Sequence, residues 1–91
     1  MWVVYILQSE KDQSYYIGCT ENMDKRLIEH NTGLSKYTSS KMPWILRYVE
    51  QVKDMREARK REAFLKRQRN RKFYEKLIAT KLVTPSARGD C

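Results

Sequence analysis

The chain has 91 residues, of which 41% are hydrophobic and 33% charged, as expected for one folded domain and not for a disordered segment. Its 19 Lys and Arg residues outnumber its 11 Asp and Glu residues, and the resulting net charge of +8 favours polyanionic partners such as nucleic acids. Two cysteines and one histidine exclude a disulfide framework and a cysteine–histidine zinc cluster, and the apolar start is too short to span a membrane. We therefore expect a cytoplasmic protein that has no membrane partner.

Two strands are predicted at the beginning of the chain. The run from Trp2 to Leu7 is continuous in β-branched and aromatic residues, which indicates a central strand buried on both faces. A polar, turn-like segment, 11–14, separates it from a second strand-like run, Tyr15 to Cys19. The two runs therefore predict a hairpin.

A short helix and a third strand are predicted next. Thr20 or Asn22 can cap a helix that continues to Asn31 and stops before Gly33. Residues 34–42 are polar and loop-like, and the apolar run at 44–52 predicts the third strand.

The second predicted helix carries an acidic residue at a position that faces the core. Asp54 followed by Glu57 is a capping-box-like start for a helix that extends to about Gln68. Glu62 shares a stripe of this helix with Leu65, so its carboxylate should face the core and not the solvent.

A last helix is predicted over residues 71–81. The whole order is then β-β-α-β-α-α, an α/β fold in which a three-stranded antiparallel sheet is flanked by helices. Residues 1–83 form the predicted domain, and residues 84–91 form a short flexible tail.

Positive charge is concentrated between residues 56 and 76. We expect this region to contact nucleic acid together with a lysine of the central loop, and the candidate contacts are Lys36, Arg59, Lys66, Arg67 and Arg69. Asn70 is either a further contact at this surface or the N-cap of the last helix.

Five side chains in a fixed order carry a resemblance to a known family. They are Tyr5 in Val3-Val4-Tyr5, Tyr16 in Tyr16-Ile17-Gly18, then Arg26, His30 and Glu62. This set resembles the GIY-YIG nuclease superfamily, which includes the catalytic domain of the repair nuclease UvrC and those of intron homing endonucleases. The resemblance covers roughly Val3 to Ile78, and Val3 stands where the family name has glycine. Longer segments are similar to the small single-domain bacterial members: Tyr16-Ile17-Gly18-Cys19-Thr20, Arg26-Leu27-Ile28-Glu29-His30-Asn31, Lys36-Tyr37-Thr38 and Arg61-Glu62-Ala63-Phe64-Leu65-Lys66.

The resemblance implies a metal-dependent endonuclease that hydrolyses DNA, with branched, flapped or damaged DNA as candidate substrates. One Mg²⁺ or Mn²⁺ ion would be held by Glu62, since Mg²⁺ accepts one carboxylate with several waters. Tyr5 would activate the water and Tyr16 would position water or phosphate, while Arg26 and His30 would bind or polarise the phosphate. The pKa of tyrosine is near 10, so a tyrosine can act as a base only if a neighbouring cation lowers that pKa. A hydrated metal ion and Arg26 could supply this effect. We expect all five side chains to share one pocket.

Other interpretations of the same residues remain open. A catalytically silent module could bind nucleic acid through the basic region 56–76, with both tyrosines serving only in packing. A small structural or protein-interaction domain is a third class. Glu62 could simply pair with Lys66 one helical turn later. The substrate could be RNA instead of DNA, and a protein partner could supply specificity, because the larger relatives carry a separate DNA-binding domain.

Overall fold

A computed structural model describes residues 1–87 of the chain. Its elements follow the order β-β-α-β-α-α, with a short 3-10 turn, Ser39–Lys41, inside the predicted loop. They are β1 (Trp2–Ser9), β2 (Tyr15–Thr20), α1 (Met23–Asn31), β3 (Trp44–Val52), α2 (Met55–Gln68) and α3 (Arg71–Ala87). This confirms the predicted fold class.

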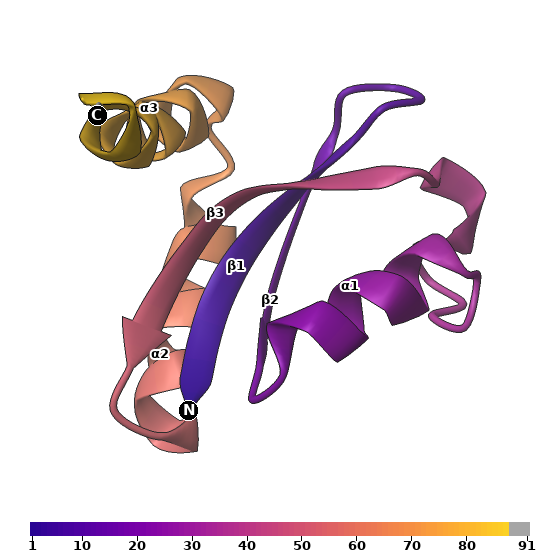
Figure 1. The fold of residues 1–91 in the computed structure, drawn as a ribbon, viewed down its shortest axis with the longest axis horizontal. Coiled ribbons are helices and arrows are strands. Elements are labelled where there is room, and N and C mark those ends of the chain that lie inside the picture. Colours follow the sequence, from indigo (N-terminus) through magenta and orange to yellow (C-terminus); the bar gives the residue numbers. More distant parts are fainter. Residues whose placement is uncertain (88–91) are drawn as a thin grey trace.

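The sheet has the strand order β2-β1-β3, with both pairings antiparallel (Figure 1). β1 is therefore the central strand, and residues Val3 to Ser9 are all buried. As inferred from the sequence, β1 is apolar along its whole length because helices cover both faces of this central strand. β2, in contrast, has a free edge.

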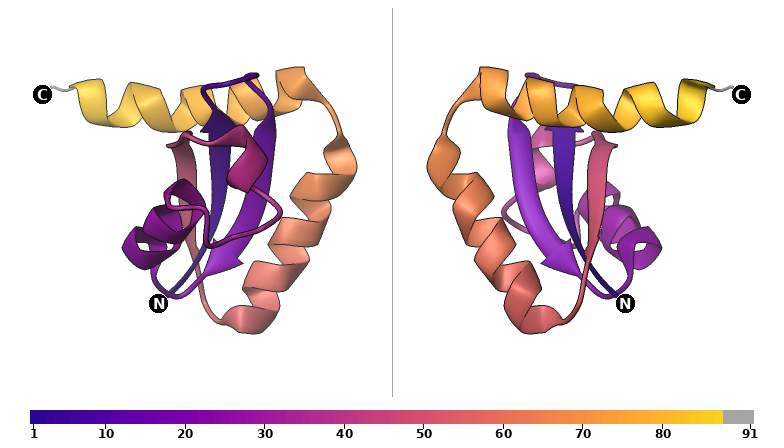
Figure 2. Two further views of the ribbon diagram at one scale, coloured as in Figure 1. Left: turned by 90° about the vertical axis from the view of Figure 1, so that its right-hand side faces the viewer. Right: turned by 90° about the vertical axis from the view of Figure 1, so that its left-hand side faces the viewer.

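The two faces of the sheet carry different helices. On one face, α2 and α3 pack against Val4 and Ile6, with Leu65 and Ile78 in the same apolar cluster. On the other face, α1 and the segment before β3 cover a cluster that includes Tyr5. Figure 2 shows α2 running beside β2 and α3 crossing one end of the sheet. Alternation of side chains along β1 thus sends Tyr5 to the α1 face and its neighbours to the other.

Helices α1 and α2 each begin at a capping residue that the sequence indicates. The Asn22 side chain accepts a hydrogen bond from the backbone N–H of Lys25 at 3.0 Å, so Asn22 and not Thr20 is the N-cap of α1. Asp54 caps α2 in the same way, through the backbone N–H of Glu57 at 2.9 Å.

The last helix differs from its prediction. α3 continues to Ala87, beyond the expected end at residue 81, so the predicted tail 84–91 overlaps the end of a helix. Residues 88–91 of that tail lie outside the described residues. None of the helices within residues 1–87 has the length and apolar character that crossing a membrane requires.

Candidate active site

A glycine creates the space for the first candidate catalytic side chain. Tyr5 of β1 lies opposite Gly18 of β2 in the antiparallel register. A Cβ on residue 18 would lie 2.5 Å from the Tyr5 hydroxyl oxygen and 2.7 Å from Cζ, so any side chain there would displace the Tyr5 ring. Gly18 therefore lets the Tyr5 ring lie flat across β2 with its hydroxyl directed toward α1.

The Tyr5 hydroxyl begins a buried chain of hydrogen bonds. Its oxygen lies 3.0 Å from His30 Nε2, and His30 Nδ1 lies 2.7 Å from Thr38 Oγ1. Thr38 donates its own hydroxyl proton to the backbone carbonyl of Ser35 at 3.3 Å, so we assign its oxygen as the acceptor from Nδ1–H. Nε2 then carries the lone pair, and Tyr5 donates to it. His30, Thr38 and Tyr5 are each no more than 1% exposed.

Burial has the largest effect on the pKa values of Tyr5 and His30 in this chain of hydrogen bonds. It raises the pKa of Tyr5 to about 12, although the neighbouring Arg26 acts in the opposite direction. Burial also lowers the pKa of His30 to about 4, and the positive charge of Arg26 adds to that effect. Arg26 therefore acts on the tyrosine pKa in the expected direction, but desolvation outweighs its effect. At neutral pH, Tyr5 is protonated and His30 is neutral.

Arg26 lies beside Tyr5 and is held by a residue of its own helix. Its Nη1 donates to Glu29 Oε1 at 2.8 Å, and this hydrogen bond, with a further one to Tyr5, raises the pKa of the guanidinium. About one third of the Arg26 side chain is exposed, at 34%. A guanidinium has five N–H donors, so Arg26 keeps donors for an anion while Glu29 fixes its plane.

Tyr16 completes the cluster from the edge strand. Its ring centroid lies 5.1 Å from that of His30 and 6.4 Å from that of Tyr5. Tyr37 of the central loop and Trp44 of β3 flank it at 6.0 Å each. Four of the five expected side chains, Tyr5, Tyr16, Arg26 and His30, are thus brought together on the α1 face.

Glu62 is not part of this cluster. It projects from α2 toward Cys19, whose thiol donates to Glu62 Oε1 at 3.1 Å. Burial, with Glu62 next in importance, raises the pKa of Cys19 to about 11, so the thiol keeps its proton. Cys19 adjoins Gly18 in β2 and therefore points to the opposite face of the sheet. The expectation that all five side chains share one pocket is wrong for Glu62, because α2 packs on the other face.

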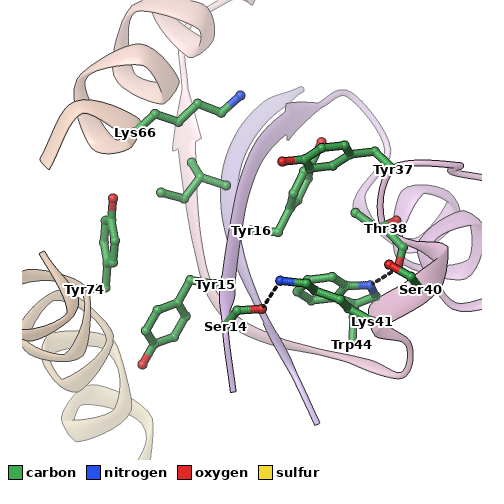
Figure 3. Close-up of a pocket in the computed structure, with 11 residues that line it drawn as sticks. Ser14, Tyr15, Tyr16, Tyr37, Thr38, Ser40, Lys41, Trp44, Lys66 and Tyr74 are labelled. Atoms are coloured by element: carbon green, nitrogen blue, oxygen red, sulfur yellow. Dashed lines mark hydrogen bonds between the residues drawn. The ribbon is translucent and has the colours of Figure 1, made fainter. Parts of the chain in front are cut away.

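The free edge of β2 connects the two faces. Lys66, one turn after Glu62, pairs with Glu62 Oε2 through Nζ at 2.7 Å. Lys66 also lines a groove of about 710 Å³ with Tyr16, Tyr37 and Thr38, and Figure 3 shows its side chain extending toward these residues. Glu62 and the tyrosine cluster therefore flank the same strand edge.

A divalent ion at this strand edge would depend on the Glu62 carboxylate. Within the described residues no three His, Cys, Asp or Glu side chains are grouped as a ready-made metal cage. Glu62 alone still suits Mg²⁺, which keeps most of its waters and takes phosphate oxygens from substrate. Both of its oxygens have protein partners here, Lys66 and Cys19, and Lys66 is 53% exposed. An ion fits this carboxylate once the lysine moves away.

The candidate nucleic-acid contacts lie in two places. Lys36 is exposed on the central loop, and Arg59, Lys66, Arg67 and Arg69 are exposed on α2 or directly after it. Asn70 has the structural role, because its Oδ1 accepts from the backbone N–H groups of Lys72 and Phe73 at 2.9 and 3.3 Å. It is the N-cap of α3.

Two residues of the site were not selected from the sequence. Thr38 orients His30, and Glu29 orients Arg26. Glu29 lies three residues after Arg26, a spacing at which helical ion pairs form, so local pattern could have indicated it. Thr38 comes from a loop, and no local signal connects it with a helix eight residues earlier.

Comparisons with known proteins identify the family of this chain. A family model described as the GIY-YIG catalytic domain matches residues 1–76. The UPF0213 protein CPE1444 of Clostridium perfringens is 43% identical over 82 residues, covering 88% of this chain and 85% of that protein. The UPF0213 protein BCE33L0031 of Bacillus cereus is 44% identical over 68 residues, covering 74% and 70%. The solution structure of the UPF0213 protein BH0048 of Bacillus halodurans aligns with a TM-score of 0.55 and 32% identity, covering 89% of this chain and 86% of that one. The chain belongs to the GIY-YIG family and shares a domain with its small UPF0213 members.

Proposed function

We propose that this protein is a metal-dependent endonuclease that hydrolyses phosphodiester bonds of DNA. The observation that carries the proposal is the buried chain from Tyr5 through His30 to Thr38, with Arg26 beside its reactive end. Membership of a family of nucleases and the net charge of +8 support a nucleic-acid substrate.

The hydrogen-bond chain gives a route for the proton of an attacking water. The route requires substrate binding to open the Tyr5 oxygen, which is 1% exposed here, to the attacking water. The water proton then moves to the Tyr5 oxygen while the Tyr5 proton moves to His30 Nε2, so no free phenolate is needed. This route accommodates a tyrosine pKa of about 12. Thr38 holds the imidazole with Nε2 facing Tyr5 throughout.

Arg26 both binds the phosphate and controls His30. Its guanidinium can offer two parallel N–H groups to the phosphate oxygens and stabilise charge growing there. Its positive charge also lowers the pKa of the neighbouring imidazole. A phosphodiester bound to Arg26 offsets that charge, so substrate binding raises the proton affinity of His30 at the step where it must accept a proton.

Glu62 would hold one Mg²⁺ or Mn²⁺ ion at the strand edge after Lys66 leaves its carboxylate. When bound, such an ion supplies Lewis-acid stabilisation of the phosphate oxygens and the leaving alkoxide. Lys66, once released, is free to pair with the nucleic-acid backbone.

The test is cleavage of labelled duplex, branched and flapped DNA, with and without Mg²⁺, by the protein and by Glu62→Gln. We expect nicking that requires the ion and is abolished by the substitution, while DNA affinity is kept. Unchanged nicking in Glu62→Gln would refute the role of Glu62.

A second function is favoured by one specific observation. Both Glu62 oxygens are already paired, with Lys66 and with Cys19, as in a purely structural carboxylate. A module that binds nucleic acid without cleaving it would keep these pairs. DNA binding with steep salt dependence but no cleavage of any substrate in the panel, RNA included, would establish that function.

A further inference from the structure

The groove at the edge of β2 is large enough to hold a ligand of its own. It encloses about 710 Å³, within the range of about 300–1,000 Å³ that small-molecule sites occupy. Figure 3 shows aromatic side chains on both sides of β2, with Tyr16, Tyr37 and Trp44 on the α1 side and Tyr15 and Tyr74 on the other. The rings on the α1 side, where Tyr37 and Trp44 flank Tyr16, suit a flat ligand that stacks.

Most of these rings are fixed by the fold, but Tyr37 is not. Trp44 is 5% exposed and donates Nε1–H to the Thr38 carbonyl at 3.0 Å. Tyr74 is 8% exposed and donates its hydroxyl to the Leu65 carbonyl at 2.6 Å. Tyr37 is 82% exposed, and its ring leans 49° from that of Tyr16 at 6.0 Å. An aromatic ring left in solvent at the mouth of a groove adds nothing to the core, so folding does not explain it.

The charges around the groove indicate an anionic ligand. Lys66 approaches from α2 and Lys41 from the turn before β3, and both side chains are about half exposed, at 53% and 46%. Each lysine is paired with one carboxylate, and ion pairs whose lysine is this exposed are weak. Flat rings and releasable cations together match a nucleotide, whose base stacks and whose phosphate is negative.

The groove is also continuous with the candidate active site. Tyr16 lies in both, and Thr38 lines the groove while its hydroxyl contacts His30. A ligand in the groove would therefore contact two residues, Tyr16 and Thr38, that also belong to the candidate active site.

We propose that this groove binds one unpaired base of the nucleic-acid substrate, stacked on Tyr37, with the adjoining phosphate near Lys66. The inference rests on the proposed function in that the ligand belongs to the substrate being cleaved. It adds that the protein recognises a nucleotide outside the double helix beside the bond it cuts, and that Tyr37 is the recognition residue.

The experiment measures binding without cleavage. The probe is a DNA duplex with a short single-stranded extension whose first unpaired base is 2-aminopurine, mixed with protein in EDTA. A blunt duplex and an extension lacking that one base serve as matched probes. Tyr37→Ala removes the ring, and Tyr37→Phe keeps it and removes only the hydroxyl. Because Tyr37 is 82% exposed, neither substitution disturbs the core, which circular dichroism verifies.

We expect the unchanged protein and Tyr37→Phe to quench 2-aminopurine fluorescence and to prefer the extended duplex. Tyr37→Ala should lose the quenching and weaken binding of the extended duplex about 5- to 150-fold, with blunt-duplex affinity unchanged. Retained quenching and preference in Tyr37→Ala, or equal weakening on both duplexes, would overturn the inference.

The same probes separate the two proposals. If Mg²⁺ brings no cleavage while the Tyr37-dependent preference persists, the endonuclease proposal fails and the base-binding groove stands. If cleavage occurs but neither binding nor quenching depends on Tyr37, the groove proposal fails and the endonuclease stands.

Discussion

Gly18 is the position at which a single methyl group should test the site most directly. Gly18→Ala places a Cβ 2.5 Å from the Tyr5 hydroxyl oxygen, 2.7 Å from Tyr5 Cζ and 3.3 Å from Tyr16 Cε2. Without these contacts the change would stabilise a strand by about 0.5–1 kcal/mol, because glycine loses more backbone entropy on folding. In this protein the close contacts with Tyr5 and Tyr16 make the substitution destabilising instead.

The magnitude follows from how little the Tyr5 ring can move. It is 1% exposed and packed in a cluster with Leu7 and Trp44, so the methyl group overpacks a closed site at a cost of about 1–3 kcal/mol. Displacing the hydroxyl from His30 adds about 0.5–1.5 kcal/mol for the lost hydrogen bond. After subtraction of the entropic gain, we expect a total loss of about 0.5–4 kcal/mol in unfolding free energy, with the protein still folded, and a loss of cleavage larger than the stability change explains.

Urea denaturation and a cleavage assay together check this expectation, and a double-mutant cycle isolates its cause. In a Tyr5→Leu background the added methyl group has no ring to meet, so Gly18→Ala should be neutral or stabilising there. Gly33→Ala is the matched control: residue 33 has φ +83°, and a Cβ there would meet only Met42 Cε at 3.9 Å, an ordinary contact, so the change strains the backbone without touching the site. The reasoning is wrong if the costs of Gly18→Ala and Tyr5→Leu simply add, or if Gly18→Ala cleaves normally.

Three further predictions concern the same residues. Tyr5→Phe keeps the buried ring and should slow cleavage about 10²–10⁴-fold while costing about 1–3 kcal/mol of stability, and a change in stability alone would return Tyr5 to a packing role. Lys66→Met removes the amine 2.7 Å from Glu62 and should tighten Mn²⁺ binding up to about fivefold in calorimetry, whereas unchanged or weaker binding would show that Glu62 holds no ion. His30 has a folded pKa of about 4 against 6.5 in the unfolded chain, so the unfolded state binds more protons between these values. The free energy of unfolding should therefore keep its full His30 contribution above pH 6.5 and fall by about 3 kcal/mol as the pH drops to 4. His30→Gln should remove that part of the pH dependence.

The regular elements were predictable because their causes are local. An unbroken apolar run indicated that β1 is buried on both faces, and side-chain caps at Asn22 and Asp54 marked where helices begin. These signals act between neighbouring residues, so they can be read along the chain. The end of α3 had no such marker, and its predicted position was too early.

The candidate site was predictable only as a set of residue types. The order of Tyr5, Tyr16, Arg26, His30 and Glu62 identified the family, and the family model agrees. The order did not place them in space. Four of these side chains converge on the α1 face, whereas Glu62 approaches β2 from the opposite face of the sheet.

The chain's pattern of apolar and capping residues fixes its strands, its helices and the face that each presents. It leaves open which helix covers which side of the sheet, since both sides offer apolar surface. That choice, made by packing between distant segments, separates Glu62 from Tyr5, brings Thr38 to His30 and leaves the edge of β2 open as a groove. Burial in the finished fold then sets the pKa values of Tyr5 and His30, which depend on neighbours that lie far away along the chain.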